Sequence, residues 1–203
     1  DHGRLIPGSP ANWYFENLRV LPRKINGVML LKGAEANVSD YDGNIDLSEK
    51  DLRSLEWVVA SMHKDVLSNP CSVDDCSRAW FNIAKNPRVN VIGHSGTDKF
   101  KYDYEMLIPM FAQEGKLVEI NNASFYVRRD SIENCKKIAK ICMKHSVPVV
   151  VNSDAHSSFQ VGRVDNVITF LKELDFPEEL IVNANVDRFK KYLREYTPIG
   201  DEI

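Results

Sequence analysis

Six short runs of apolar residues recur along the chain, and a longer mixed segment separates each run from the next. Most runs are rich in valine, isoleucine and leucine and lack a clean alternation with polar residues. Such runs are typical of parallel strands covered on both faces, because both sets of side chains then pack against other elements. The pattern predicts strands at 28–31, 57–60, 89–92, 117–120, 147–151 and 180–182.

The segments between these runs carry apolar residues three and four positions apart, which is the spacing of an amphipathic helix. Asp103 stands where a helix N-cap is expected, and Gly115 stands where that helix would end. In segment 37–56, Asp42-Gly43 predicts a turn, and only a short helix is expected. Strands alternating with helices form βαβ units, so we expect one α/β domain over 1–203. The helices are predicted at 73–86, 104–114, 132–145, 164–174 and 186–196.

Residues that can bind a metal or donate hydrogen bonds recur at intervals of 27 to 33 positions, mostly just after the predicted strands. Repeated βα units form either an open sheet, which would spread these groups along a line, or a closed barrel. A barrel brings the carboxyl ends of its strands to one rim, where active sites of such folds lie. The sequence therefore favours a TIM-like α/β barrel. The residues are His2, Glu35, His63, His94, Asn121 and Asp154.

The side chains at these positions are mainly imidazoles and carboxylates. This mixture suits Zn²⁺, Mn²⁺ or Fe²⁺, whereas Mg²⁺ and Ca²⁺ usually take oxygen ligands alone. The strongest local element is an apolar strand ending in Asp154 and His156, two residues apart, which can serve neighbouring ions if both face the rim. The predicted metal ligands are His2, Glu35, His63, His94, Asp154 and His156.

Clustered divalent ions suit the hydrolysis of phosphate esters. They lower the pKa of bound water, hold phosphate oxygens and stabilise the leaving oxygen. The chain contains no GxSxG, P-loop or GxGxxG motif that would indicate a rival chemistry. The sequence thus predicts a metal-dependent phosphoesterase, with Glu35, Asp154 and His156 as candidate catalytic residues.

A bound phosphate also needs positive charge where metal ions do not reach it. Arg128 and Arg129 follow the fourth predicted strand on the expected rim, and a guanidinium can bind phosphate through two hydrogen bonds. Ser95, Asn121 and Asn122 are candidates for orienting ligands or substrate.

Six segments resemble, in order, motifs of the PHP (polymerase and histidinol phosphatase) superfamily, most closely its YcdX-type phosphatase branch. The resemblance implies a distorted (β/α)7 barrel with three metal ions, often zinc, and a metal-bound hydroxide that attacks a small phosphate monoester. It also assigns each ligand to an ion: Asp154 to the first, His63 and His94 to the second, His2 and His156 to the third, with Glu35 bridging two. The segments are Asp1-His2-Gly3, Gly33-Ala34-Glu35-Ala36-Asn37, Ala60-Ser61-Met62-His63, Val91-Ile92-Gly93-His94, Glu119-Ile120-Asn121-Asn122 and Asn152-Ser153-Asp154-Ala155-His156.

The chain departs from the PHP pattern at its start. The family opens with a strand carrying an HxH pair, which is absent here, and Asp1-His2-Gly3 would ordinarily follow a strand. We therefore expect about 40 further residues in the natural protein, roughly one βα unit and a strand. Two rival classes stay open: an amidohydrolase-like C–N hydrolase, and a catalytically inactive PHP module stabilised by metal. Metal content and hydrolysis of an aryl phosphate would separate them.

Composition and charge change this picture little. A net charge of −3 gives no broad basic surface, so we expect no nucleic-acid partner. No apolar run approaches the ~20 residues that span a bilayer, so no membrane partner is expected either. The four cysteines have no zinc-binding spacing and are predicted to be free thiols in a reducing cytoplasm. We expect a cytoplasmic protein acting on a small phosphorylated substrate, and a homo-oligomer stays open.

Overall fold

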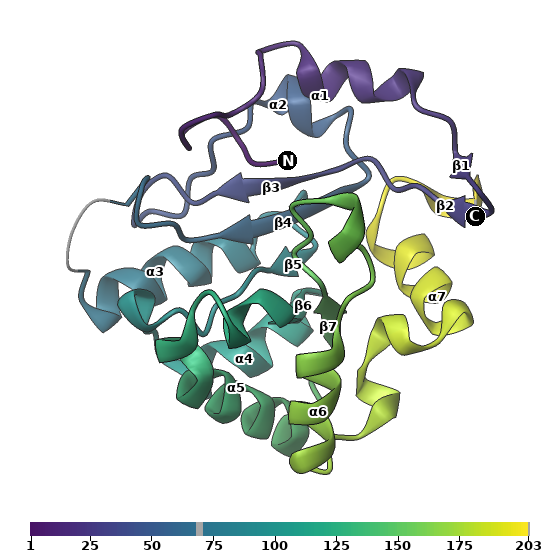
Figure 1. The fold of residues 1–203 in the computed structure, drawn as a ribbon. Coiled ribbons are helices and arrows are strands. Elements are labelled where there is room, and N and C mark those ends of the chain that lie inside the picture. The colour runs from purple at the N-terminus through teal and green to yellow at the C-terminus, as the bar shows by residue number, and fades with distance from the viewer. Residues whose placement is uncertain (68–70, 203) are drawn as a thin grey trace.

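A computed structural model describes residues 1–67 and 71–202 and contains a parallel sheet of five strands (Figure 1). The register pairs Asn37 with Ser61 and Asn121 with Asn152, so polar residues stand together at the carboxyl ends of neighbouring strands. The strands lie side by side in chain order: β3 (Gly33–Asn37), β4 (Trp57–Ser61), β5 (Val91–Ile92), β6 (Leu117–Asn121) and β7 (Val149–Asn152).

The five longer helices confirm the predicted ones to within two residues at each end. In Figure 1, α3, α4 and α5 lie side by side along the sheet, while α1 and α2 lie beyond β3. The α-helices are α1 (Tyr14–Asn17), α2 (Glu49–Leu52), α3 (Val73–Ala84), α4 (Tyr104–Gln113), α5 (Ile132–His145), α6 (Asp165–Glu173) and α7 (Val186–Tyr196). Short 3-10 helices are η1 (Leu18–Val20), η2 (Asp98–Phe100), η3 (Asn122–Phe125), η4 (Arg129–Ser131), η5 (Ser158–Gln160), η6 (Glu178–Leu180), η7 (Val182–Ala184) and η8 (Gly200–Glu202).

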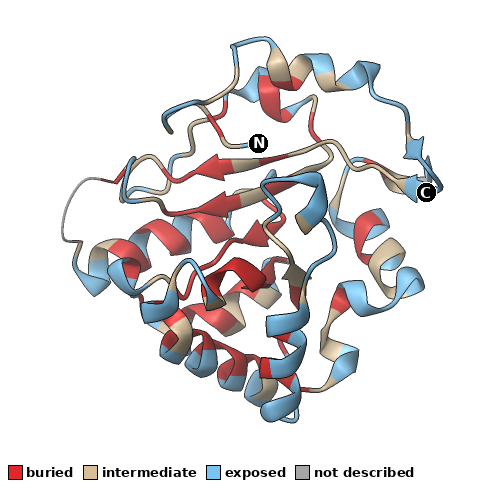
Figure 2. Ribbon diagram, in the orientation of Figure 1, coloured by how far each residue is buried: buried red, intermediate tan, exposed pale blue. Residues whose placement is uncertain are grey.

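The hydrophobic core lies between the sheet and α3 to α5. Trp80 of α3, Phe111 of α4 and Ile138 of α5 are each at most 2% exposed. Figure 2 shows buried residues in the strands and on the inner sides of these helices. Each such side chain contributes about 1.5–3 kcal/mol to stability by leaving water. Cys135 and Cys142 are buried on α5, and all four cysteines are free thiols, as predicted.

The predicted first strand, 28–31, is a strand only at Val28–Met29, and its predicted place in the parallel sheet is wrong. Val28–Met29 (β2) instead pairs antiparallel with Lys24–Ile25 (β1), as a hairpin apart from the main sheet. The connecting Asn26 and Gly27 both have positive φ, which is the conformation of a two-residue Asn-Gly hairpin turn. Val28 is exposed, so the apolar run had no buried face. The true first strand of the sheet is β3, with Glu35 at its centre.

The sheet is open, so the predicted closed barrel is not found in the part of the chain that the structure describes. β3 and β7 are its two edges and do not pair with each other. Past these edges, the described residues form single parallel bridges, from His2 to Glu35 and from Ile181 to Val149. The predicted strand at 180–182 is therefore wrong, because η6 and η7 flank this one bridge. A barrel needs continuous pairing around its circumference, which single bridges do not provide.

No helix in 1–67 or 71–202 combines the length and apolar character required to cross a bilayer.

Candidate metal centre

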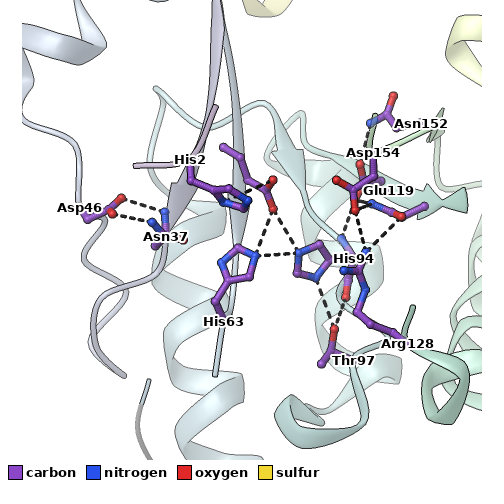
Figure 3. Close-up of polar contacts among 12 residues, drawn as sticks. His2, Asn37, Asp46, His63, His94, Thr97, Glu119, Arg128, Asn152 and Asp154 are labelled. Carbon is purple, nitrogen blue, oxygen red and sulfur yellow. Dashed lines mark hydrogen bonds and ion pairs between the residues drawn. The ribbon is translucent and has the colours of Figure 1, made fainter. Parts of the chain in front are cut away.

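Three predicted ligands meet where β3 lies beside the loops that follow β4 and β5. Glu35 Oε1 is 3.3 Å from Nε2 of His63 and 3.1 Å from Nε2 of His94. The two Nε2 atoms are themselves 3.1 Å apart (Figure 3). Side chains 28 and 59 positions from Glu35 thus converge on one carboxylate oxygen.

The spacing of these three atoms fits a bound metal ion. A tetrahedral ion with bonds of about 2.0 Å holds neighbouring ligand atoms about 3.3 Å apart. The observed separations are 3.1, 3.1 and 3.3 Å. One cation would satisfy all three lone pairs, whereas hydrogen bonds alone require a proton on at least one of the facing ring nitrogens.

His2 joins this group from the edge of the sheet. Its Nδ1 is 3.7 Å from Glu35 Oε2, and its ring meets that of His63 edge-on at 4.9 Å between centroids. The ligand atoms of His2, Glu35 and His63 all lie within 4.8 Å of one another. Within the described chain, Nδ1 of His2 and Nδ1 of His63 are buried without a hydrogen-bond partner. An unpaired buried nitrogen is costly, and a metal ion beside Glu35 would relieve that cost at Nδ1 of His2. We call His2, Glu35, His63 and His94 the histidine cluster.

Local electrostatics favour the metal-binding forms of these side chains. Burial has the largest effect on Glu35 and raises its pKa, but hydrogen bonds to His63 and His94 outweigh it. The pKa of Glu35 therefore lies well below its ordinary value. Burial lowers the pKa of His2, although Glu35 opposes the shift. At neutral pH, Glu35 is thus anionic and His2 neutral, the forms in which they bind metals.

The turn that carries His94 has an unusual backbone. A Cβ at Gly93 would overlap Oγ of Ser61, so only glycine fits there without movement. His94 has a φ of 22°, which residues other than glycine rarely adopt. Its N–H donates to Glu119 Oε2 at 2.7 Å. Backbone strain of this kind persists where surrounding contacts hold it, often at functional sites.

Arg128, Asp154 and Asn121 form a second group, which we call the arginine–aspartate group. Nη2 of Arg128 donates to Asp154 Oδ2 at 2.9 Å and to Asn121 Oδ1 at 3.1 Å. Nδ2 of Asn121 donates to the same aspartate oxygen at 3.2 Å. Asp154 also has a positive φ, 55°. In Figure 3, Arg128 and Asp154 lie on the far side of His94 from His2 and His63.

His156 stands at the margin of the second group. Its side chain is 70% exposed, and its Nδ1 lies 3.7 Å from Asp154 Oδ1. The same nitrogen hydrogen-bonds the Asp154 carbonyl at 2.9 Å, and the backbone N–H donates to Gln160. The structure therefore places His156 beside Asp154 and records no contact with the histidine cluster in the described residues.

The remaining candidates lie outside both groups. Arg129 is exposed in η4, one residue beyond Arg128. Oδ1 of Asn122 accepts hydrogen bonds from two backbone N–H groups in the first turn of α6. Ser95 hydrogen-bonds the hydroxyl of Tyr102. Asn122 and Ser95 thus hold neighbouring structure, whereas Asn121 contacts both Arg128 and Asp154.

Glu119 also belongs to this region, although the sequence pattern did not predict it as a site residue. It is 8% exposed and accepts hydrogen bonds from the His94 backbone, Asn121 and Asn152. Burial raises its pKa, while His94 and the hydrogen bond from Asn152 oppose the shift. The available signal was an acidic residue in the middle of the apolar run 117–120, because a buried carboxylate needs hydrogen-bond donors or a cation.

Asp46 was missed as well, and it anchors the segment that carries His2. Its carboxylate accepts hydrogen bonds from the backbone and side-chain nitrogens of Asn37, at 2.8 and 2.6 Å, and from Leu5 N at 2.8 Å. A Cβ at Gly3 would overlap this carboxylate, so the glycine permits the close approach. The result is that His2 stays beside Glu35.

Comparison with known proteins identifies relatives of this chain. A family model described as PHP-associated matches residues 133–184. A "Probable phosphatase" of Acetivibrio thermocellus is 43% identical over 194 residues, covering 96% of this chain and 80% of the relative. One of Caldicellulosiruptor saccharolyticus is 44% identical over 194 residues, covering 96% and 81%. One of Clostridium botulinum is 41% identical over 201 residues, covering 99% and 82%.

These relatives match nearly the whole chain at about 40% identity, so they define its class. The chain belongs to the PHP-associated phosphatase family.

Proposed function

We propose that this protein is a metal-dependent phosphatase of the YcdX type that hydrolyses a small phosphate monoester. The observation that supports this most directly is the triangle of Glu35 Oε1 and the Nε2 atoms of His63 and His94, with sides of 3.1 to 3.3 Å. Relatives named probable phosphatases support the choice of phosphate hydrolysis as the reaction at this triangle.

We propose that the histidine cluster holds Zn²⁺, or in its place Mn²⁺ or Fe²⁺, with Glu35 as the shared ligand. Asp154 and His156 are proposed ligands for the rest of a trinuclear site. Bound divalent ions would supply Lewis acidity and activate water for attack on phosphorus. The anionic state of Glu35 and the neutral state of His2 suit this role, because neither has to lose a proton to bind an ion.

Arg128 is proposed to bind the substrate phosphate. Its Nη2 donates to both Asp154 and Asn121. A guanidinium carries five N–H donors, so another of them can donate to a phosphate oxygen without releasing the aspartate. Asn121 fixes the orientation, because its side chain contacts both Arg128 and Asp154. Substrate orientation would therefore be set from β6 and β7.

The test combines elemental analysis with aryl phosphate hydrolysis for wild type, His94→Ala, Asp154→Ala and His145→Ala. His145 is an exposed histidine at the end of α5 and serves as the matched control. We expect bound divalent metal and turnover in wild type and His145→Ala, and a loss of turnover in the other two. Chelation should abolish activity, and added Zn²⁺ or Mn²⁺ should restore it. Equal turnover in all four proteins would refute the proposal, as would hydrolysis of amides without hydrolysis of phosphates.

A further inference from the structure

Glu119 is a buried carboxylate that belongs to neither the histidine cluster nor the arginine–aspartate group but contacts a member of each. It lies at the centre of β6, on the same face as Asn121 because strand side chains alternate. Oε2 accepts from His94 N at 2.7 Å and from Asn121 Nδ2 at 3.2 Å. Oε1 accepts from Asn152 Nδ2 at 2.7 Å. Both oxygens are thus occupied by N–H donors, from the loop after β5, from β6 and from β7.

The contact with His94 holds its backbone in a conformation that it would otherwise leave. With φ at 22°, His94 needs a compensating interaction, and a short hydrogen bond from its N–H to a carboxylate supplies one. The backbone angle sets the direction in which the imidazole leaves the chain. Its Nε2 lies 3.1 Å from Glu35 Oε1 and 3.1 Å from His63 Nε2. A turn of the peptide would carry this nitrogen away from the histidine cluster.

Other contacts of Glu119 lead to Asp154. The Asn121 amide nitrogen lies 3.2 Å from Glu119 and 3.2 Å from Asp154 Oδ2, so one amide group spans both carboxylates. Asn152, two residues before Asp154, donates to the opposite oxygen of Glu119. The backbone at Asp154 has a positive φ, as at His94. The Glu119 carboxylate therefore contacts both segments with positive φ: the turn at His94 directly, and the turn at Asp154 through Asn121 and Asn152.

We propose that Glu119 is a positioning residue that aims His94 Nε2 at Glu35 and sets the spacing between the histidine cluster and Asp154. It acts through His94, Asn121 and Asn152 and contacts neither substrate nor metal. Its consequence for metal binding rests on the proposed function, whereas its effect on the His94 backbone does not.

The test variant is Glu119→Gln, which keeps the size of the side chain and replaces one acceptor oxygen with an NH₂ group. If that NH₂ faces His94 and Asn121, it meets two existing N–H donors. If it faces Asn152, the Asn152 amide can rotate to accept from it, and the His94 N–H then donates to a neutral oxygen in place of a carboxylate. Glu133→Gln, at an exposed site in the first turn of α5, is the matched control. In metal-free protein, NMR should show the His94 amide proton at low field in wild type and the control. In Glu119→Gln that resonance should move upfield, with faster hydrogen exchange.

Calorimetric titration with Zn²⁺ supplies the second readout. Residues that orient metal ligands typically contribute 10- to 100-fold to affinity, so the zinc dissociation constant should rise about 10- to 100-fold in Glu119→Gln and stay unchanged in the control. An unmoved His94 resonance, or unchanged zinc affinity in a variant of a protein that does bind zinc, would overturn the inference.

The outcomes separate this inference from the proposed function. If wild type binds no zinc and hydrolyses no phosphate, the proposed function fails, while a shifted His94 resonance still supports positioning by Glu119. If Glu119→Gln does not fold, Asn152→Ala removes only the donor to Oε1. That variant should raise the zinc dissociation constant by a smaller factor, and wild-type affinity in it would overturn the inference.

Discussion

The two ends of the parallel sheet differ in how many of their buried polar groups have hydrogen-bond partners. At the amino end, Asn90 accepts a hydrogen bond from Val58 N at 2.9 Å and donates one to the Tyr196 carbonyl at 3.0 Å. Lys116 donates to the carbonyls of residues 86 and 89, both at 2.8 Å. The side-chain polar atoms of Asn90 and Lys116 are therefore paired within the protein.

At the carboxyl end, several buried polar atoms are left without a partner in the described residues. They include Nδ1 of His2 and His63, Nε of Arg128, Oδ1 of Asn37 and Oγ of Ser61. Unpaired buried groups cost stability, and they persist where a ligand completes them. If the proposed ligands bind at the carboxyl end, substitutions there should weaken binding and leave stability nearly unchanged, whereas substitutions at the amino end should do the reverse.

The largest effect on binding is expected from His63→Gln. Removing a proposed ligand should lower zinc affinity and aryl phosphate turnover by at least ~100-fold, beyond the usual effect of residues that only orient ligands. The free energy of unfolding of the metal-free protein should change by no more than about 1 kcal/mol, because glutamine keeps an N–H donor for Glu35 and Nδ1 of His63 has no internal partner among the described residues. Calorimetry, turnover and urea unfolding measure the three quantities. A large loss of stability in the metal-free protein would contradict the view that His63 serves binding and contributes little to stability.

Arg128→Ala and Arg129→Ala test which of the two adjacent arginines binds the substrate phosphate, because the sequence alone did not distinguish them. Losing a charge-assisted hydrogen bond to phosphate costs about 1.5–3 kcal/mol, so kcat/KM should fall about 10- to 100-fold in Arg128→Ala. Arg129 is exposed, so its variant should behave as wild type. Steady-state kinetics on one aryl phosphate compares them directly. Equal losses in both variants would mean that the arginine–aspartate group does not orient the substrate.

The sequence predicted the histidine cluster better than it predicted the strand that carries Glu35. The apolar run 28–31 suggested a strand, yet Asn26-Gly27 turns it into an exposed hairpin. The placement of Glu35 survived this error, because β3 follows directly and delivers the residue to the same edge of the sheet. Periodicity located the long helices because each buries one face against the sheet.

Pairings that depend on register could not be read from the sequence. Arg128 meets Asp154 across 26 positions, and Glu119 meets Asn152 across 33, only once β6 and β7 align. The open sheet was missed for a similar reason, since polar residues after successive strands gather on a curved open sheet as well as on a closed one. The marginal position of His156 depends on a loop, where local pattern carries little information.

At the amino end, Asn90→Ala should reduce stability and spare function. It leaves the buried Val58 N–H and the Tyr196 carbonyl without their partner, which costs about 1–3 kcal/mol of unfolding free energy. Asn82→Ala, which removes one exposed hydrogen bond to Asp42, is the control and should cost less. Zinc affinity and turnover of the folded protein should match wild type in both. A loss of zinc affinity in Asn90→Ala would mean that residues at the amino end of the sheet also affect metal binding.

The smallest expected effect is a pH dependence of stability that arises from Lys116. Burial lowers the pKa of Lys116 to about 8 from 10.5, although Glu114 opposes the shift. Between these values the unfolded chain binds a proton at Lys116 that the folded protein does not, so this group alone makes stability rise with pH from about 8. Burial raises the pKa of Cys76, Cys135 and Cys142 from 9.0, and above pH 10 that of Tyr192 as well, so these groups lower stability as pH rises. The contribution of Lys116 is therefore the difference between two proteins: in urea unfolding from pH 8 to 10, wild type should have a more positive slope of stability against pH than Lys116→Met. Identical slopes would mean that the ammonium group at this end reaches water and is not held by the two carbonyls alone.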